Sequence, residues 1–329
     1  MHYDFVAIGD ITIDAFIRLK DARVHCDIDD KNCQLCVRFG DKIPYESVTI
    51  VKAVGNSPNA AVSANRLGLV TGLVTNLGDD QNGADCTEVL SSEGVSTEFV
   101  RTHTGIPTNY HYVLQYEAER TILIKHEIYP YSLPSFETDP KWLYLSSLGE
   151  TSLSFHEEIG AYLSSHPSVK LAFQPGTFQI SLGTEKLHSI YTNTELLICN
   201  KQEAQKITSL SSDDAQELVQ ALHALGPKQV VLTDGVNGAY ASDGSSMWYV
   251  PIYPDPAPPV SRTGAGDATA STTTTYLSLG LSLPDSLLRG AINSMSVVQH
   301  IGAQMGLLTR EQIEEYLANA PENFKAQVL

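Results

Sequence analysis

Basic residues are scarce in this sequence, and no block of lysine and arginine stands out. The chain of 329 residues carries 21 Lys and Arg against 38 Asp and Glu, which gives a formal net charge of −17 at pH 7. Proteins that bind nucleic acid or acidic membrane surfaces usually present a basic patch or stripe. We therefore expect neither a nucleic-acid nor a membrane partner. An anionic ligand would need local groups such as backbone N–H donors, because the overall field of the protein repels anions.

Long apolar runs are missing as well. No uninterrupted apolar stretch reaches the roughly 18–20 residues that a membrane-spanning helix needs. The opening stretch "MHYDFVAIGD" has no basic segment, and Asp10 and Asp14 follow soon. We interpret it as a buried strand and not as a signal peptide.

Cysteine is also rare, and the five cysteines form an odd set at positions 26, 33, 36, 86 and 199. In a long chain this favours reduced thiols and a cytoplasmic location over a disulfide framework. The segment "HCDIDDKNCQLC" could still offer Zn²⁺ four ligands, namely His25, Cys26, Cys33 and Cys36. The adjacent His25 and Cys26 would have difficulty chelating one ion together. Ordinary thiols are therefore the preferred interpretation, and zinc at Cys26, Cys33 and Cys36 is the alternative.

Short apolar and β-branched runs alternate with helical patterns along most of the chain. Strands are expected at 5–11, 70–78, 142–148, 169–175, 194–200 and 228–235. Helices are expected at 59–69, 86–95, 155–166, 201–207, 215–226, 266–280, 284–301 and 309–319. This alternation predicts an α/β fold with three αβα layers around a mainly parallel central sheet. We expect residues 1–329 to form a single domain.

Two regions break the alternation. Residues 13–52 hold two strand-like runs around a polar, cysteine-bearing insert, and residues 104–126 include a hairpin pattern with a turn near Glu117–Glu119. A small antiparallel layer beside an α/β core suggests a lid over the ligand crevice, which lies at the carboxyl ends of the strands in open α/β sheets. A homodimer formed through this lid is a further hypothesis.

A glycine-rich turn, "RTGAGDATAST", follows the proline-rich stretch "YPDPAPPVS". From the residues alone, Asp267 can be an ordinary N-cap of the following helix. Alternatively, the N–H groups of Ala265, Gly266 and Asp267 form an anion cradle, and the Asp267 carboxylate accepts the proton of a hydroxyl that attacks phosphorus. The sequence contains no P-loop, and the turn lacks the third glycine of a dinucleotide fingerprint.

The turn resembles the signature of the ribokinase-like carbohydrate kinases, also called the phosphofructokinase-B type. Further matches follow in the family's order over nearly the whole chain: "AIGDITID", "VGNSPNAAVSANRLGL", "TNLGDDQNG", "NKQE", "LTDGVNGAY" and "HIGAQ". Val54 replaces the first glycine of the family's Gly-Gly pair. The resemblance implies the family's fold with its lid. It also implies an ATP-dependent kinase that uses Mg²⁺ to phosphorylate a hydroxymethyl group of a small sugar or nucleoside.

The resemblance also implies roles for individual residues. Asp267 would be the general base, and Gly264, Ala265 and Gly266 would form the anion hole. Substrate hydroxyls would be bound by Asp14, which ends the family's first strand, by Gly55 and Asn59, and, more weakly, by Glu150. Nucleotide-binding roles would belong to Asn200, Glu203, Thr233, Gly235, Gly238 and Asn293. Glu203 would orient Mg²⁺ through water, since this ion keeps most of its hydration shell.

These positions also have plain structural interpretations. Asn200 and Glu203 have the spacing of a capping box at a helix start, and both interpretations can hold together. The 233–238 segment can be a simple hairpin turn, Asp14 a solvated strand-end carboxylate, and Asn293 a solvated helix residue.

Three finer expectations concern ligands and the alternative function. A phosphorylated sugar is disfavoured as the acceptor, because the lid segment "IPTNYHYVL" has no Arg or Lys to bind its phosphate. Many relatives start the glycine turn with aspartate and threonine, where this chain has Ser261 and Arg262, so we expect weak dependence on potassium. A non-catalytic sugar- or nucleotide-binding protein is the alternative function, and Asp267 argues against it, since a sensor needs no general base.

Overall fold

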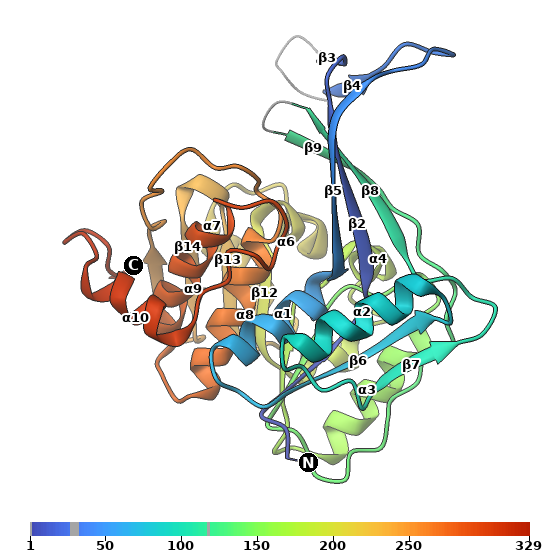
Figure 1. Ribbon diagram of the computed structural model, residues 1–329. Helices are drawn as coiled ribbons and strands as arrows, with labels where there is room; N and C mark the ends of the chain where they lie inside the picture. The colour runs from blue at the N-terminus through green and yellow to red at the C-terminus, as the bar shows by residue number, and fades with distance from the viewer. Residues whose placement is uncertain (1, 27–32, 117–118) are drawn as a thin grey trace.

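The computed structural model describes residues 2–26, 33–116 and 119–329. A large central sheet is flanked by helices, and a smaller four-stranded sheet rises beside it (Figure 1). This arrangement confirms the predicted α/β fold with a lid. Within the described residues, no helix combines the length and apolar character that crossing a bilayer requires.

The central sheet has the strand order β16-β15-β14-β13-β12-β11-β10-β1-β6-β7. The strands are β1 (Phe5–Ile8), β6 (Thr71–Gly78), β7 (Val100–His103), β10 (Trp142–Leu145), β11 (Lys170–Phe173), β12 (Thr194–Asn200), β13 (Gln229–Thr233), β14 (Ala239–Ser242), β15 (Met247–Val250) and β16 (Gln327–Val328). In the order of the sheet, β7, β6, β1, β10, β11, β12 and β13 run parallel to one another. The strands β14, β15 and β16 then extend the sheet with antiparallel pairing. The mainly parallel sheet is confirmed, whereas β7 and the antiparallel edge strands were not expected.

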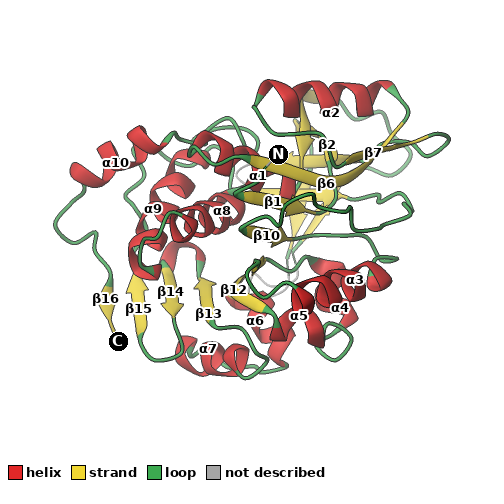
Figure 2. Cartoon of the chain, turned by 90° about the horizontal axis from the view of Figure 1, so that it is seen from below, coloured by secondary structure: helices red, strands yellow, loops and turns green. Residues whose placement is uncertain are grey.

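Helices cover both faces of this sheet (Figure 2). One layer holds α1 (Asn56–Arg66), α2 (Gln81–Ser92), α8 (Ala265–Ser278), α9 (Leu283–Val297) and α10 (Arg310–Ala318). The other holds α3 (Leu153–Ser165), α4 (Thr177–Leu182), α5 (His188–Thr192), α6 (Lys201–Thr208) and α7 (Ala215–His223). Phe5 and Ala7 pack in the first layer, and Val6 and Ile8 pack in the second, as the alternation along a strand requires.

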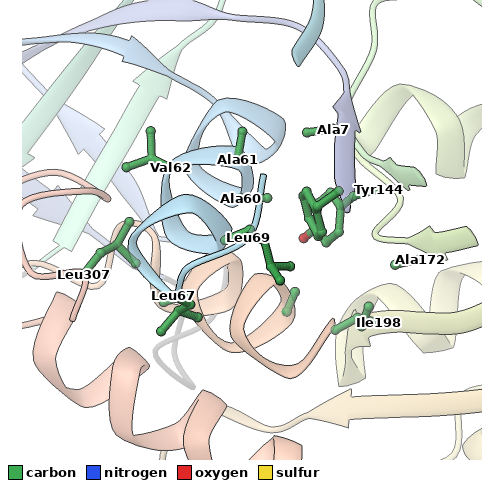
Figure 3. Packing of buried hydrophobic residues seen from close by; sticks show 14 of the residues in the cluster. Ala7, Ala60, Ala61, Val62, Leu67, Leu69, Tyr144, Ala172, Ile198 and Leu307 are labelled. Carbon is green, nitrogen blue, oxygen red and sulfur yellow. The ribbon is translucent and has the colours of Figure 1, made fainter. Parts of the chain in front are cut away.

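Small side chains bring α1 and α8 close to the sheet. Figure 3 shows Ala60 and Ala61 of α1 beside strand residues such as Tyr144. Helix α8 carries a buried run of polar residues from Ser271 to Thr275. Three hydroxyls of this run donate to backbone carbonyls within the helix, so burying these groups leaves them bonded. Close packing places the N-terminus of α8 against the carboxyl edge of the sheet.

The lid is a sheet with the strand order β5-β2-β8-β9. Its strands are β2 (Thr12–Leu19), β5 (Tyr45–Val54), β8 (Tyr110–Tyr116) and β9 (Glu119–Leu123). These strands fall largely within the segments 13–52 and 104–126, where lid elements were expected, and β2 and β8 pair in parallel. Part of the turn predicted at Glu117–Glu119 lies outside the described residues. Asp14 lies within β2 and not at the end of the first strand, because β1 already ends at Ile8 and Asp10 follows it.

A two-stranded ribbon, β3 (Arg23–His25) and β4 (Gln34–Cys36), stands at the tip of the lid (Figure 1). Cys26 and Cys33 form a disulfide there, so the expectation of reduced thiols is wrong for this pair. Both sulfurs are engaged with each other, and neither is free to bind zinc in this state. Cys36 is a free, exposed thiol, whereas Cys86 and Cys199 are free and buried. Burial raises the pKa of the Cys86 thiol to about 11, so it stays protonated.

Candidate active site

Two adjoining cavities lie where the carboxyl ends of the parallel strands meet the lid and the start of α8. The larger has a volume of about 450 Å³ and is lined by Asp10, Gln174, Asn200 and Thr233, each at or just beyond the end of a strand. The smaller measures about 240 Å³. Thr233, Arg262 and Gly266 line both, so a ligand in one cavity can reach a ligand in the other. This position agrees with the crevice expected for an open α/β sheet.

The Asp267 carboxylate lies in the larger cavity and is held by three amide side chains. Oδ1 accepts hydrogen bonds from Asn56 Nδ2 at 2.8 Å and Gln174 Nε2 at 3.1 Å. Oδ2 accepts one from Asn59 Nδ2 at 2.8 Å. Burial raises the pKa of Asp267, and the hydrogen bonds from Asn59, Gln174 and Asn56 oppose that rise. The result is a fixed carboxylate that binds a proton more readily than an ordinary aspartate.

Two hydrogen-bond chains in turn fix those amides. Gln174 Oε1 accepts from the hydroxyl of the buried Tyr144. Asn59 Oδ1 accepts from Gln304 Nε2 at 3.0 Å, and Gln304 also donates to the Ala53 carbonyl. The Asn59 amide therefore holds Asp267, and because Asn59 also lines the larger cavity, its expected contact with substrate hydroxyls stays a prediction.

The glycine turn forms the start of α8. Gly264 is the N-cap residue with φ +86, and α8 begins at Ala265. Asp267 is the third residue of α8 and not its N-cap, so the plain interpretation as an N-cap is wrong. Helix geometry leaves the first N–H groups of α8 without intrahelical acceptors, and these groups attract anions. Gly264 and Gly266 line the larger cavity, and Ala265 lines the smaller.

The smaller cavity has the character of a site for a flat heterocycle. Apolar side chains line much of it: Val236, Ile252, Ala291, Met295 and Val298. Gly235 begins the short 3-10 helix η1 (Gly235–Asn237) and Gly238 is its C-cap; both have positive φ and line the cavity. Thr233 lines this cavity as well, and a nucleotide-binding role for these three residues stays a prediction.

Asn200 and Glu203 form the capping box of α6. The Asn200 side chain accepts from the Glu203 N–H, and Glu203 Oε2 accepts from the Asn200 N–H at 2.9 Å. Both residues also line the larger cavity, so the structural and ligand-binding interpretations are compatible. Burial raises the pKa of Glu203. Over the described part of the chain there is no cluster of three or more potential metal ligands, and an oxygen donor such as Glu203 suits a hydrated Mg²⁺ that takes few protein ligands.

Polar groups gather at the lid end of the larger cavity. Asp14 and Gly55 line it as expected, and Asp10, His111 and His126 line it in addition. Sequence reasoning missed these three, as well as Asn56 and Gln174. Asp10 and Gln174 are each the second-last residue of a predicted strand, 5–11 and 169–175, so the rule that ligands bind at carboxyl ends could have found them.

Two predicted site residues lie elsewhere. Glu150 is exposed and is not among the residues that line either cavity. Asn293 is fully buried in the core, where Nδ2 donates to Thr272 Oγ1 and Oδ1 accepts from the Leu308 N–H. Its expected contact with adenine is corrected, because Ala291, Ser294 and Met295 of the same helix face the cavity instead.

The lid does supply a cationic side chain. Arg120 of β9 lines the larger cavity, and its charge opposes the rise that burial causes in the pKa of Asp267. Arg262 is exposed and lines both cavities, while Ser261 is buried with its hydroxyl bonded to Thr263 Oγ1. The expected absence of a cation from the lid is therefore wrong, because Arg120 lies in β9, beyond the segment "IPTNYHYVL".

Known proteins are similar to this chain in sequence and in architecture. Residues 33–310 match the family described as pfkB family carbohydrate kinase. The chain is 28% identical to ribokinase of Bacillus subtilis over 272 residues, which cover 80% of this chain and 87% of the relative. It is 25% identical to fructoselysine 6-kinase of Escherichia coli over 250 residues, which cover 76% and 90%. The structure of Arabidopsis thaliana ribokinase complexed with ribose and ATP superposes with a TM-score of 0.79 at 20% identity and covers 96% of this chain and 99% of that one.

Proposed function

Because this chain belongs to the pfkB family of carbohydrate kinases, we propose that it transfers the γ-phosphoryl group of ATP to a hydroxymethyl group of a small sugar or nucleoside. One observation carries the proposal. A carboxylate held by three amides lies in the larger cavity at the start of α8, next to Gly266, which lines both cavities. In-line phosphoryl transfer needs an acceptor on one side, a nucleotide on the other and a proton acceptor between them.

Each part of the site has one task in this proposal. The adenine and ribose of ATP occupy the smaller cavity against Val236, Ala291 and Met295. The acceptor occupies the larger cavity, and Asp267 takes the proton of its attacking hydroxyl. The turn from Gly264 to Asp267 stabilises charge on the transferred group through backbone N–H donors. Mg²⁺, when bound, neutralises phosphate charge, and Glu203 would hold it through water.

The alternative is a non-catalytic protein that binds a sugar or nucleotide on the same fold. The amides of Asn56, Asn59 and Gln174, which we call the amide cage, argue against this alternative. They fix a carboxylate that a protein without catalytic activity does not require. The direct test measures ADP release from ATP with a panel of pentoses, hexoses, sugar acids and nucleosides. We expect release that depends on one acceptor class. Binding of an acceptor and ATP without any ADP release would favour the alternative.

The amide cage leads to a pH prediction. Asn56→Ala removes one donor from Asp267, and fewer donors to the carboxylate raise its pKa further. Since the base must be deprotonated, the acid limb of the kcat profile should move to higher pH, with less loss of kcat at alkaline pH. The pH profile of kcat checks this. Gln205→Ala is the control, because its amide bonds the Ser212 carbonyl instead. An unmoved acid limb in Asn56→Ala would show that Asp267 does not control it.

The start of the turn predicts weak dependence on potassium. Ser261 offers no carboxylate to a monovalent cation, and Arg262 supplies a permanent positive charge at both cavities. Replacing K⁺ by a bulky ammonium ion at constant ionic strength should change the rate by less than about tenfold, roughly 1.4 kcal/mol of barrier. A larger fall contradicts the prediction. Ser261→Asp combined with Arg262→Thr should introduce potassium activation.

We also propose that residues 1–329 act as one catalytic domain and that two copies associate through their lids. Ile50 and Tyr112 pair with Ala15, whose neighbour Asp14 faces the cavity, so their side chains lie on the opposite face of the lid. Both are about half exposed, as Val48 and Leu123 of the same sheet also are. An exposed apolar face of this kind favours association.

A further inference from the structure

A buried glutamine near the larger cavity connects the lid to the amide cage around Asp267. Gln304 is only 7% exposed and does not belong to the lining of either described cavity. Its neighbours Gly302 and Ala303 do line the larger cavity. Any influence of Gln304 on a reaction in that cavity must therefore act through another residue.

Both protons of the Gln304 amide nitrogen are in use. Nε2 donates to the Ala53 carbonyl at 2.8 Å and to Asn59 Oδ1 at 3.0 Å. Asn59 Nδ2 in turn donates to Asp267 Oδ2 at 2.8 Å. A backbone carbonyl and a carboxylate can only accept hydrogen bonds, so this chain of bonds has an acceptor at each end. Each amide between the two ends therefore has one orientation that satisfies all the bonds.

The orientation of the Asn59 amide matters for the carboxylate. An amide side chain that turns over exchanges the places of its oxygen and its nitrogen. A turned Asn59 amide would place Oδ1 against the Asp267 carboxylate, where two acceptors repel each other. It would also place Nδ2 against Gln304 Nε2, where two donors meet. Gln304 thus selects the orientation in which Asn59 donates to Asp267.

Backbone contacts hold both partners of this selection in place. Ala53, at the cavity end of lid strand β5, has φ +56, a conformation that a non-glycine residue keeps only where its surroundings hold it. Arg66 Nη1 donates to the Gln304 carbonyl at 2.7 Å, and its guanidinium also makes two bonds to Glu93. Arg66 ends α1, the helix that carries Asn59, so Gln304 and Asn59 are fixed to the same helix.

We propose that Gln304 is a positioning residue for phosphoryl transfer, which sets the orientation of the Asn59 amide and thereby keeps Asp267 free to accept a proton. This inference rests on the proposed function, in which Asp267 is the general base. A hydrogen bond to the charged form of an acid favours that form, so loss of the orientation makes Asp267 keep its proton to higher pH. Of the three amides in the cage, Asn59 opposes most strongly the rise that burial causes in the pKa of Asp267.

Other titratable and charged groups also face Asp267. Its charge interacts with Arg120 of β9, with the buried Tyr144 of β10 and with Glu203 of α6. The larger cavity is also lined by Asp10, Asp14, His111, His126, Cys199 and Arg262. The variants that test the proposal leave all these groups unchanged, so a shift in the titration of Asp267 reports on the amides.

The test follows the protonation of Asp267 by carbon-13 NMR of protein labelled at aspartate Cγ, which needs no turnover. The signal missing from Asp267→Asn identifies the residue. Gln304→Met removes the donor and keeps the length of the side chain. Gln299→Met is the control, because it makes the same change in a glutamine whose amide donates to the Ala257 carbonyl. Asn59→Ala, alone and with Gln304→Met, shows whether Gln304 acts through Asn59.

We expect the titration midpoint of Asp267 to rise by about one pH unit in Gln304→Met, since a hydrogen bond to a charged group is worth that much or more. The acid limb of kcat should rise with it, while the affinity for a non-hydrolysable ATP analogue, which also reports folding, stays unchanged. The double variant should titrate like Asn59→Ala alone. Gln304→Glu should also raise the midpoint, because an ionised side chain cannot donate, and it tests the proposal if Gln304→Met does not fold.

Three results would overturn the inference. They are a wild-type midpoint in a folded Gln304 variant, an equal rise in Gln299→Met, and a double variant in which the two single rises add. If these titrations come out as expected but wild-type protein transfers no phosphoryl group, the proposed function fails, whereas the control of Asp267 by Gln304 stands.

Discussion

Replacing Asp267 with asparagine is expected to lower kcat by about 10²–10⁴-fold, the usual contribution of a general base. The variant loses the group that accepts the hydroxyl proton, while the smaller, nucleotide-type cavity does not include Asp267 among its lining residues. ATP affinity should therefore change little. Steady-state kinetics and calorimetric titration with an ATP analogue measure the two quantities separately.

Asp285 offers a matched control for this experiment. It occupies the third position of α9, as Asp267 does in α8, but it is exposed at the surface. An acidic residue at a helix start stabilises it by about 0.3–1 kcal/mol whether or not it is catalytic. Asp285→Asn should therefore lose a little stability and no activity. If Asp267→Asn kept near wild-type kcat, Asp267 would be no more than a helix-start residue of the same kind.

Replacing Gly264 with alanine should damage both stability and activity. The residue has φ +86, and an added Cβ would lie 2.3 Å from the Ala303 Cβ and 2.6 Å from its Cα. Positive φ and forced backbone movement together should lower the free energy of unfolding by about 2–4 kcal/mol. Moving the N–H donors of the turn should reduce kcat by at least about 10²-fold. Thermal unfolding and kcat are the measurements.

Gly266→Ala separates the two effects. A Cβ at Gly266 would meet only Gln174 Nε2, at 4.0 Å, and the residue lies within α8. Alanine is a better helix former than glycine by about 1 kcal/mol, so this variant should unfold at an equal or higher temperature. Its methyl group would still face both cavities and reduce turnover. Equal loss of stability in Gly264→Ala and Gly266→Ala would contradict our account of the turn.

The architecture could be predicted well because it depends on local patterns. Alternating strands and helices gave the layers, and the alternation in 108–125 gave the β8–β9 hairpin. The edge strands β14, β15 and β16 are short and end the sheet, so no periodic pattern marked them. Cys26 and Cys33 show another limit, since spacing alone does not reveal whether two sulfurs come within bonding distance.

The site could be predicted only in part, because its contacts join distant segments. Asn59 and Asp267 are 208 residues apart, and no sequence pattern shows that the Asn59 amide donates a hydrogen bond to the Asp267 carboxylate. Asn293 lies on α9, which lines the smaller cavity. Successive residues of a helix point in directions that differ by roughly 100°, so Ser294 faces the cavity while Asn293 faces the core. The sequence pattern places His111 in a strand, yet its contact with Asp14 depends on the register between β2 and β8.

The most direct measurement of the central claim is the phosphorus NMR spectrum of the product made from ATP and the acceptor selected by the ADP-release panel. Our account predicts a phosphate monoester whose phosphorus couples to the two protons of a methylene group, formed by wild-type protein and not, on the same time scale, by Asp267→Asn. A signal from inorganic phosphate alone, from a phosphate on a ring hydroxyl, or of equal intensity with Asp267→Asn would contradict it.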